Sequence, residues 1–108
     1  MLSVIHNAIS LTRGDSATLR LQIKKEDGRD YEIAPDDTIV FTVKKSTRDK
    51  DVVLQKAAIY SRIEILARET EALEYRTYYY DVELRKADGF VATVIPPSPF
   101  KITEEVTF

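Results

Sequence analysis

The side chains that could perform chemistry are few in this chain and are spread along it. His6 is the only histidine of the 108 residues, and there is no cysteine. A triad with a histidine base would therefore have to use a residue close to the N-terminus, and a thiolate metal site is excluded. No nucleophile, base and orienting group can be named together. We expect no catalytic residue, His6 included, no cofactor and no enzymatic activity.

Carboxylates that could bind a cation or form an acid/base pair occur as Asp36-Asp37, as Asp49 with Asp51, and as Glu104-Glu105. An EF-hand loop needs oxygen ligands at several spaced positions plus a glycine, and a glycosidase needs its carboxylates in a cleft. Each pair lacks the rest of such a site. We interpret the pairs as solvated charges in turns and predict no metal ligand.

Arg13-Gly14-Asp15 is the tripeptide that integrins read, but three residues in this order arise often by chance. The better interpretation is a simple turn, in which Gly14 permits a positive φ and Asp15 accepts from a nearby backbone N–H. The three glycines of the chain all lie in predicted turns, and none belongs to a phosphate-binding loop.

The aromatic residues suggest an interface rather than a reaction. Tyr79 takes the outward position of its predicted strand, and tyrosine is favoured at interfaces because its ring covers area while its hydroxyl stays satisfied. The alternative is that Tyr79 pairs across the sheet with a neighbouring strand. Tyr79 is the one candidate interface residue. It belongs to a group of four tyrosines: Tyr75, Tyr78, Tyr79 and Tyr80.

Composition excludes several classes of partner. The 16 basic and 18 acidic residues give a net charge of -2, and both signs are interspersed. A basic footprint for nucleic acid is therefore missing. Residues 1–10 lack the features of a signal peptide, and no apolar run approaches the ~18 residues of a membrane span. We expect one domain over residues 1–108, made in the cytoplasm, with no nucleic-acid or membrane partner.

The elements that must position these side chains centre on residues 77–95, where two β-rich segments meet at Asp88-Gly89. An Asp-Gly pair between alternating apolar residues is a strong hairpin signal. A two-residue type I′ loop would place Val82 opposite Ile95 and put Val91 and Ile95 on the buried face. A three-residue loop would reverse that assignment.

Alternation predicts further strands at residues 3–11, 17–24, 38–45, 52–59 and 61–67, with a last short strand around Phe100 and Ile102. The inward positions are expected to share one core. They are Leu19, Leu21, Ile23, Ile39, Phe41, Val43, Tyr80, Val82 and Leu84.

Turns and breaks complete the pattern. Asp27-Gly28 predicts a second hairpin, continued by Tyr31 and Ile33. Residues 68–75 are expected to form a connector of a helical turn or two with Thr70 as a candidate cap. Pro96-Pro97-Ser98-Pro99 is expected to stop strand pairing, because proline has no N–H to donate. Together these elements predict an all-β fold: an immunoglobulin-like antiparallel β-sandwich of about seven or eight strands with one short helical turn. A small β-barrel is the alternative.

The order of these pieces is similar to the N-terminal domain of phage baseplate upper proteins and related prophage tail proteins of Gram-positive bacteria. The similarity covers nearly the full chain. It runs through the Gly-Asp turn at Gly14, the alternating strands, the Thr70 connector, the Tyr-rich strand, the Asp88-Gly89 hairpin and the closing strand at Phe100.

The resemblance implies a structural assembly module of a phage or prophage tail. It implies docking onto other copies, as a homo-oligomer, or onto neighbouring tail and baseplate proteins, in the host cytoplasm during assembly and then in the virion tail. The family's pattern supplies no catalytic or cofactor residue. Its longer members continue into receptor-facing regions, so no host-recognition role is carried over. The alternative function is an immunoglobulin-like binding module of a cell-surface or carbohydrate-recognising protein.

Overall fold

The computed structural model describes residues 2–5, 7–25 and 27–106, and these form an all-β fold with one short helix. The strands are β1 (Leu2–Ile5), β2 (Ala8–Thr12), β3 (Ala17–Arg20), β4 (Thr38–Lys44), β5 (Leu54–Ala57), β6 (Arg62–Ile65), β7 (Thr77–Arg85) and β8 (Val91–Thr103). The helix is α1 (Ala67–Glu71).

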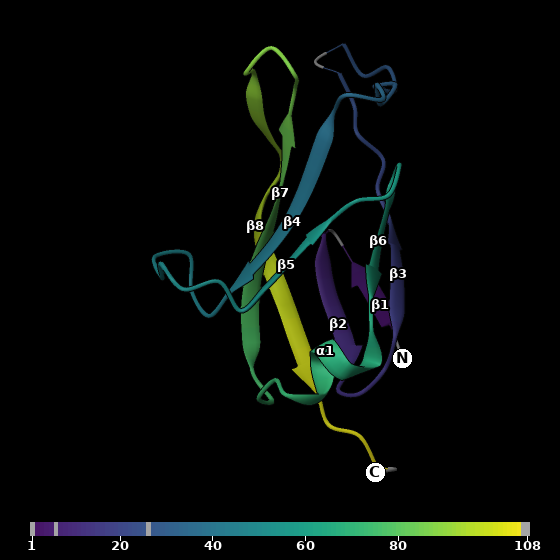
Figure 1. The fold of residues 1–108 in the computed structure, drawn as a ribbon. Coiled ribbons are helices and arrows are strands. Elements are labelled where there is room, and N and C mark those ends of the chain that lie inside the picture. Colours follow the sequence, from purple (N-terminus) through teal and green to yellow (C-terminus); the bar gives the residue numbers. More distant parts are fainter. Residues whose placement is uncertain (1, 6, 26, 107–108) are drawn as a thin grey trace.

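The strands form a six-stranded sheet in the order β1-β2-β8-β7-β4-β5 and a two-stranded sheet of β3 and β6 (Figure 1). The large sheet is mixed, because β2 and β8 run parallel, with Ile9 beside Phe100 and Leu11 beside Ile102. The prediction of a purely antiparallel fold is therefore wrong at this pair. Alternation fixes which side chains face the core, but it is the same for either strand direction.

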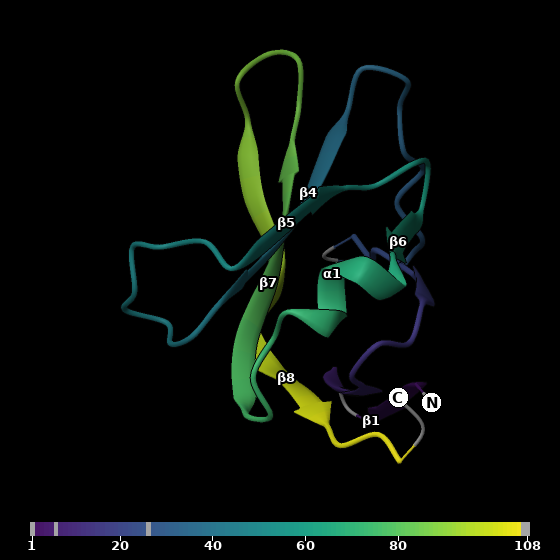
Figure 2. The ribbon, with the colours of Figure 1, turned by 60° about the horizontal axis from the view of Figure 1, so that its bottom comes forward.

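The large sheet curls, and α1 and β6 lie across the opening of the curve (Figure 2). Because the sheet wraps around the core, side chains from nearly every strand meet inside it. The buried apolar residues that form this core are Ile9, Leu11, Leu19, Ile23, Ile39, Phe41, Val43, Ile63, Ile65, Leu73, Tyr78, Tyr80, Val82, Leu84, Phe100 and Ile102.

Three aromatic rings from adjacent strands lie at the centre of the core. The ring of Phe41 on β4 lies 5.1 Å from that of Tyr80 on β7 and 6.0 Å from that of Phe100 on β8, centroid to centroid. The Tyr80 hydroxyl donates to the carbonyl of Asn7, 2.5 Å away. A buried tyrosine needs such a partner, so this bond ties the β1–β2 turn to the core.

The predicted inward positions are confirmed. Eight of the nine are buried, and the ninth, Leu21, is partly buried and packs against the same core. Val40, which alternation places outward, is also buried.

Of the two loop lengths considered for the central hairpin, two residues and three residues, the structure has the three-residue loop. The Lys86 N–H donates to the Phe90 carbonyl at 2.8 Å, and Gly89 has a φ of 94°. Val91 therefore lies opposite Arg85 and is exposed, contrary to its expected burial. One irregularity farther along the ladder, between Glu83 and Val82, then brings Val82 opposite Ile95, as the two-residue loop predicted, and a second follows between Val82 and Tyr80.

The prolines do not stop β8, which contradicts the expected break at residues 96–99. The Ile102 N–H donates to the Arg76 carbonyl, on the β7 side of the strand. Because successive residues of a strand point their N–H groups to opposite sides, the Pro99 nitrogen points away from β7. On that other side, pairing with β2 begins only at Phe100. Pro99 thus interrupts no ladder bond. Pro96 and Pro97 lie at the irregularity between Tyr80 and Val82, where a missing N–H is also tolerated.

Two other predicted strands are altered by local turns. Residues 3–11 form two strands rather than one, because the chain reverses near Asn7, whose φ is 69°. The strand predicted over residues 17–24 ends at Arg20, and beyond it Lys24 makes an isolated bridge to Asp30 across the confirmed turn at Gly28. The predicted continuation through Tyr31 and Ile33 packs on the core without forming a strand.

The connector is helical as expected, but Thr70 does not cap it. The helix begins after Leu66, whose N–H donates to the Glu69 carboxylate at 2.8 Å. Burial acts to raise the pKa of Glu69, but this bond and Lys56 at 2.9 Å outweigh it, so the pKa is lowered. Thr70 lies inside the helix and is buried, and its hydroxyl accepts from the Gly14 N–H at 2.9 Å.

Tyr60 has a backbone conformation that lowers the stability of the fold. It forms, with Ser61, a two-residue loop closed by hydrogen bonds between Ile59 and Arg62. Its φ is 57°, and its side chain is 82% exposed. A non-glycine residue pays roughly 1–2 kcal/mol in this left-handed region, and an exposed ring offers little packing in return.

Phe41→Ala is expected to lower the free energy of unfolding by about 3–5 kcal/mol, because it empties the centre of the aromatic cluster. Chemical denaturation of both proteins measures this. Phe90→Ala is the matched control: Phe90 is exposed in the hairpin loop, and its loss is expected to cost under about 1 kcal/mol. Equal losses for the two variants would contradict the assigned core.

Tyr60→Gly is expected to raise the free energy of unfolding by about 1 kcal/mol, because glycine adopts a positive φ without a Cβ clash. Thermal unfolding measures the change. Tyr60→Ala removes the same ring but keeps a Cβ, so it is not expected to stabilise. If alanine stabilises as much as glycine, the exposed ring and not the backbone is the source of the cost.

Candidate functional site

Tyr79 lies near the start of β7, on the face of the sheet that points away from the core. Its neighbours Tyr78 and Tyr80 are buried, whereas Tyr79 is 37% exposed. In the ladder it lies between Lys44 of β4 and Pro99 of β8. The outward orientation thus agrees with the alternation, and the ring also has cross-strand neighbours, so the two interpretations of this residue are compatible.

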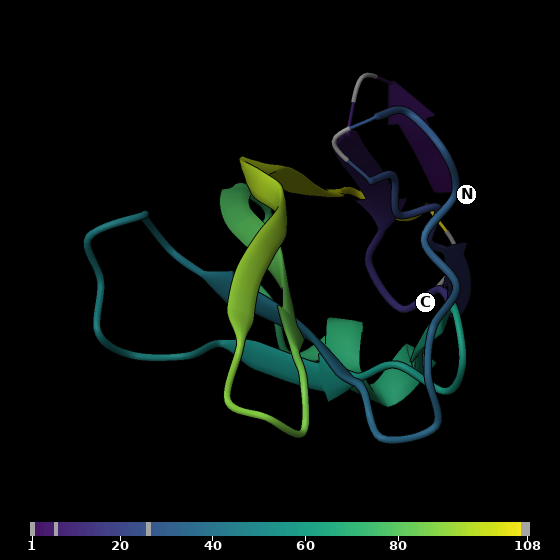
Figure 3. The same cartoon turned by 90° about the horizontal axis from the view of Figure 1, so that it is seen from above.

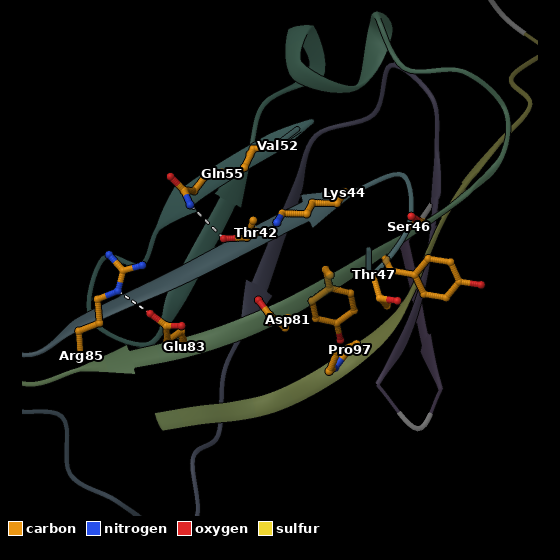
Figure 4. Close-up of a pocket in the computed structure, with 12 residues that line it drawn as sticks. Thr42, Lys44, Ser46, Thr47, Val52, Gln55, Asp81, Glu83, Arg85 and Pro97 are labelled. Carbon is orange, nitrogen blue, oxygen red and sulfur yellow. Dashed lines mark hydrogen bonds and ion pairs between the residues drawn. The ribbon is translucent and has the colours of Figure 1, made fainter. Parts of the chain in front are cut away.

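An open pocket of ≈ 290 Å³ lies beside Tyr79 on this outward face (Figure 4). Its floor is made by alternate residues of β4, β5 and β7, and the loop of residues 45–53 forms one wall. We call this surface the Tyr79 face. The polar and aromatic side chains that give the Tyr79 face its chemistry include Thr42, Lys44, Gln55, Tyr79, Asp81 and Glu83.

The ladder register explains why these side chains meet. Thr42 of β4 lies opposite Gln55 of β5 on one side and opposite Asp81 of β7 on the other. A polar row therefore crosses three strands. Gln55 Nε2 donates to Thr42 Oγ1 at 3.1 Å, which orients the amide within the row (Figure 4).

Asp81 is a residue of the Tyr79 face whose charged form is disfavoured by its surroundings. Burial raises its pKa, the neighbouring Glu83 carboxylate raises it further, and Lys44 partly offsets both. Glu83 itself is bonded to Arg85, with Nε and Oε1 2.6 Å apart. Within the described residues, the Asp81 carboxylate accepts no hydrogen bond from a side chain or backbone group, so it is available to a donor from outside.

The Tyr79 face can therefore bind but offers little for bond-making chemistry. It combines a half-exposed aromatic ring with hydroxyl, amide, ammonium and carboxylate groups, which suit hydrogen bonding and ring contact. Over residues 2–5, 7–25 and 27–106, no three His, Cys, Asp or Glu side chains gather in a way that could hold a metal ion.

The Arg13-Gly14-Asp15 turn is used inside the fold. The Arg13 guanidinium lies 4.2 Å from the centroid of the Tyr75 ring and bonds Glu105 at 2.9 Å. The Tyr75 hydroxyl donates to the same carboxylate, and the Arg13 bond is the main cause of the lowered pKa of Glu105. This clamp fastens the segment after β8 to the turn, so Arg13 is engaged rather than presented.

Of the remaining carboxylate pairs, one contributes to local structure through Asp37. Asp37 Oδ2 accepts from the Tyr31 hydroxyl at 2.5 Å and from the Ala34 N–H at 2.9 Å, and the former bond is the main cause of its lowered pKa. Asp49 and Asp51 lie exposed in the loop after β4. His6 lies outside the described residues.

The sequence predicts Tyr79 as an interface residue, a prediction that the fold leaves open, but it does not predict that Lys44, Gln55 and Thr42 share its pocket. The outward positions of β4 carry a signal, since Thr42 and Lys44 alternate with the buried Phe41 and Val43. What the pattern lacks is the strand order, which brings β4 and β5 beside β7.

Asp81→Asn is expected to raise the thermal midpoint at pH 7. The pKa of Asp81 is raised in the folded protein, so the ionised carboxylate destabilises the fold at any pH above that value. Below about pH 4 the carboxyl is protonated in the unfolded chain as well, so the gain is expected to vanish there. Melting curves across this pH range measure it.

Asp49→Asn is the control for the loss of one negative charge, because Asp49 is exposed in a loop. A lower midpoint for Asp81→Asn at pH 7 would show that the Asp81 carboxylate stabilises the sheet instead.

Among the described residues, no helix is long and apolar enough to cross a membrane. Comparison with known proteins gives no match to a protein-family model, to a curated protein or to a solved structure. A proposal for the function therefore rests on the Tyr79 face and on the resemblance to phage tail proteins in the order of strands and turns.

Proposed function

We propose that this domain is a non-enzymatic assembly module that acts through protein–protein contacts of its Tyr79 face. Following the resemblance, the apparatus it serves is a phage or prophage tail, at the baseplate. The fold would correspond to an immunoglobulin-like β-sandwich in which the β3–β6 sheet is the smaller layer.

The observation that supports this proposal is the exposure of Tyr79 within a polar surround. Interface hot spots are enriched in tyrosine and are typically ringed by residues that exclude water while contributing little energy. Lys44, Asp81 and Gln55 supply such a ring, and the pocket gives a partner side chain space to enter beside Tyr79.

The partners we propose are neighbouring tail or baseplate proteins and further copies of this chain. The domain would assemble in the host cytoplasm and then remain in the virion tail. Interspersed charges and a net charge of -2 argue against nucleic acid as a partner. A partner that places a donor over Asp81 would also relieve the cost of its buried charge.

A second candidate function rests on the polar row of the same face. Gln55, Thr42 and Asp81 line up across three strands in a pocket that Tyr79 also lines, and hydrogen-bonding groups beside an aromatic ring can hold a sugar. On this reading the domain is a carbohydrate-recognising or cell-surface binding module.

Tyr79→Ser is expected to weaken the assembly. Removing a central tyrosine typically costs more than ~2 kcal/mol of binding, a rise in Kd of roughly thirtyfold. Analytical ultracentrifugation of the domain alone and with the products of the adjacent genes measures the change. Tyr60→Ser is the matched control, because it removes an exposed tyrosine outside the Tyr79 face.

A wild-type domain that binds none of these proteins and stays monomeric at high concentration would overturn the proposal. Binding of wild type, but not of Tyr79→Ser, to an array of glycans would favour the carbohydrate function instead. An unchanged assembly in the Tyr79→Ser variant would remove Tyr79 from the contact.

A further inference from the structure

The first half of β8 has one free edge. β7 pairs with it except at Val94, where the ladder shifts, and pairing with β2 begins only at Phe100. In the described part of the chain, no strand pairs with the other side of residues 91–95. This segment and its hairpin project beyond the rest of the large sheet, with the free side of β8 facing outward (Figures 1 and 3). We call residues 91–95 the open β8 segment.

The ladder shows which backbone groups point to the free side. Lys86 donates to Phe90 at 2.8 Å, so these two form a hydrogen-bonded pair. Hydrogen-bonded and non-hydrogen-bonded pairs alternate along an antiparallel ladder. Since Val91 lies opposite Arg85 and Thr93 opposite Glu83, the N–H and C=O groups of Val91 and Thr93 turn away from β7.

The side chains of the open β8 segment do little to protect it. No charged residue occurs between Asp88 and Lys101, although charged side chains are a common defence of an exposed strand edge. Val91 is 55% exposed and Phe90, just before it, is 54% exposed. Prolines are the other common defence, and they begin only at Pro96, so they shield the strand after this segment.

β5, at one end of the sheet, contrasts with this segment. It carries Lys56, which is held by Glu69 at 2.9 Å, and it follows a loop rich in both charges. The edge at β5 therefore carries a charged side chain, the common defence that the open β8 segment lacks. Two copies meeting along the open β8 segment would oppose no charges at all.

From these observations we infer that the open β8 segment pairs with the same segment of a second copy, antiparallel, about a two-fold axis at Thr93. Thr93 is the middle residue and has its backbone groups on the free side, so the two Thr93 residues would exchange both hydrogen bonds. Because the ladder with β7 shifts at Val94, between Thr93 and Ile95, the exchange at Thr93 is the pairing that the register fixes. Both free edges are used, so the association closes as a dimer.

This surface is distinct from the Tyr79 face, although the dimer fits within the assembly role proposed above. Residues 91–95 line no part of the pocket beside Tyr79. A dimer joined at the open β8 segment would therefore leave both Tyr79 faces free. It would present two of them on one continuous sheet.

The absence of cysteine from the chain allows a direct test. Residues directly opposite in an antiparallel pair have Cα atoms roughly 4.5–5.5 Å apart, which suits a disulfide. Thr93→Cys is expected to give a disulfide-linked dimer under mild oxidation. Ala57→Cys, at an exposed position of β5, is the matched control and is expected to form no disulfide-linked dimer.

Sedimentation of uncrosslinked protein provides the second readout. Wild type is expected to dimerise, and Thr93→Lys to raise the dimer Kd about fivefold, because it sets like charges opposite each other. Ala57→Lys adds the same charge on β5 and is expected to leave the Kd unchanged. A monomeric wild type, or equal crosslinking of the two cysteine variants, would overturn the inference.

Different results would contradict the β8 pairing and the assembly role of the Tyr79 face. A dimer that survives Thr93→Lys but is lost in Tyr79→Ser would place self-association on the Tyr79 face and overturn the β8 pairing alone. A dimer that crosslinks at Thr93→Cys in a domain that binds no tail protein would uphold the β8 pairing while the assembly role falls.

Discussion

β7 is hydrogen-bonded along both edges and buries every second side chain, and the rest of the fold depends on that double constraint. On one side it holds β4 through seven paired residues, and on the other it holds β8 from Thr77 to Arg85. Tyr80 therefore lies between Phe41 and Phe100, and the three rings occupy the centre of the curl. The Tyr80 hydroxyl then fixes the β1–β2 turn through Asn7, so this side chain links three strands, β4, β7 and β8, and a turn.

The part of this fold that follows from sequence is the part set by alternation. The inward sets of β4 and β7 are local patterns, because each strand has a fixed period and one buried face. Strand direction and neighbours are set by contacts distant in sequence, so the parallel pairing of Ile9 with Phe100 left no local trace. The prediction that the prolines stop strand pairing was wrong for a related reason. Whether a missing N–H matters depends on which neighbour it would have reached, and Pro99 faces the side where β2 has not yet begun.

The candidate site divides in the same way. The outward orientation of Tyr79 follows from the strand period, but the pocket beside it arises because Lys44 and Gln55 are brought across from other strands. The raised pKa of Asp81 has a cause of each kind: the alternation already places Glu83 beside it, but burial, the larger cause, arises only in the assembled sheet. Arg13 is the opposite case: it belongs to a tripeptide known for recognition, but in the fold its guanidinium contacts Glu105 and Tyr75 of the same chain.

The prolines of β8 divide this strand between two roles. After Pro99 its outer edge belongs to β2, which closes the sheet on that side. Before Pro96 the same edge has no partner within the described residues, yet the strand remains ordered because β7 pairs with it and the Asp88-Gly89 loop closes it. The irregularity at Pro96-Pro97 thus separates a half that builds the fold from a half whose backbone groups point outward. Since the Tyr79 face uses side chains and the open β8 segment uses backbone, the two surfaces can be occupied independently.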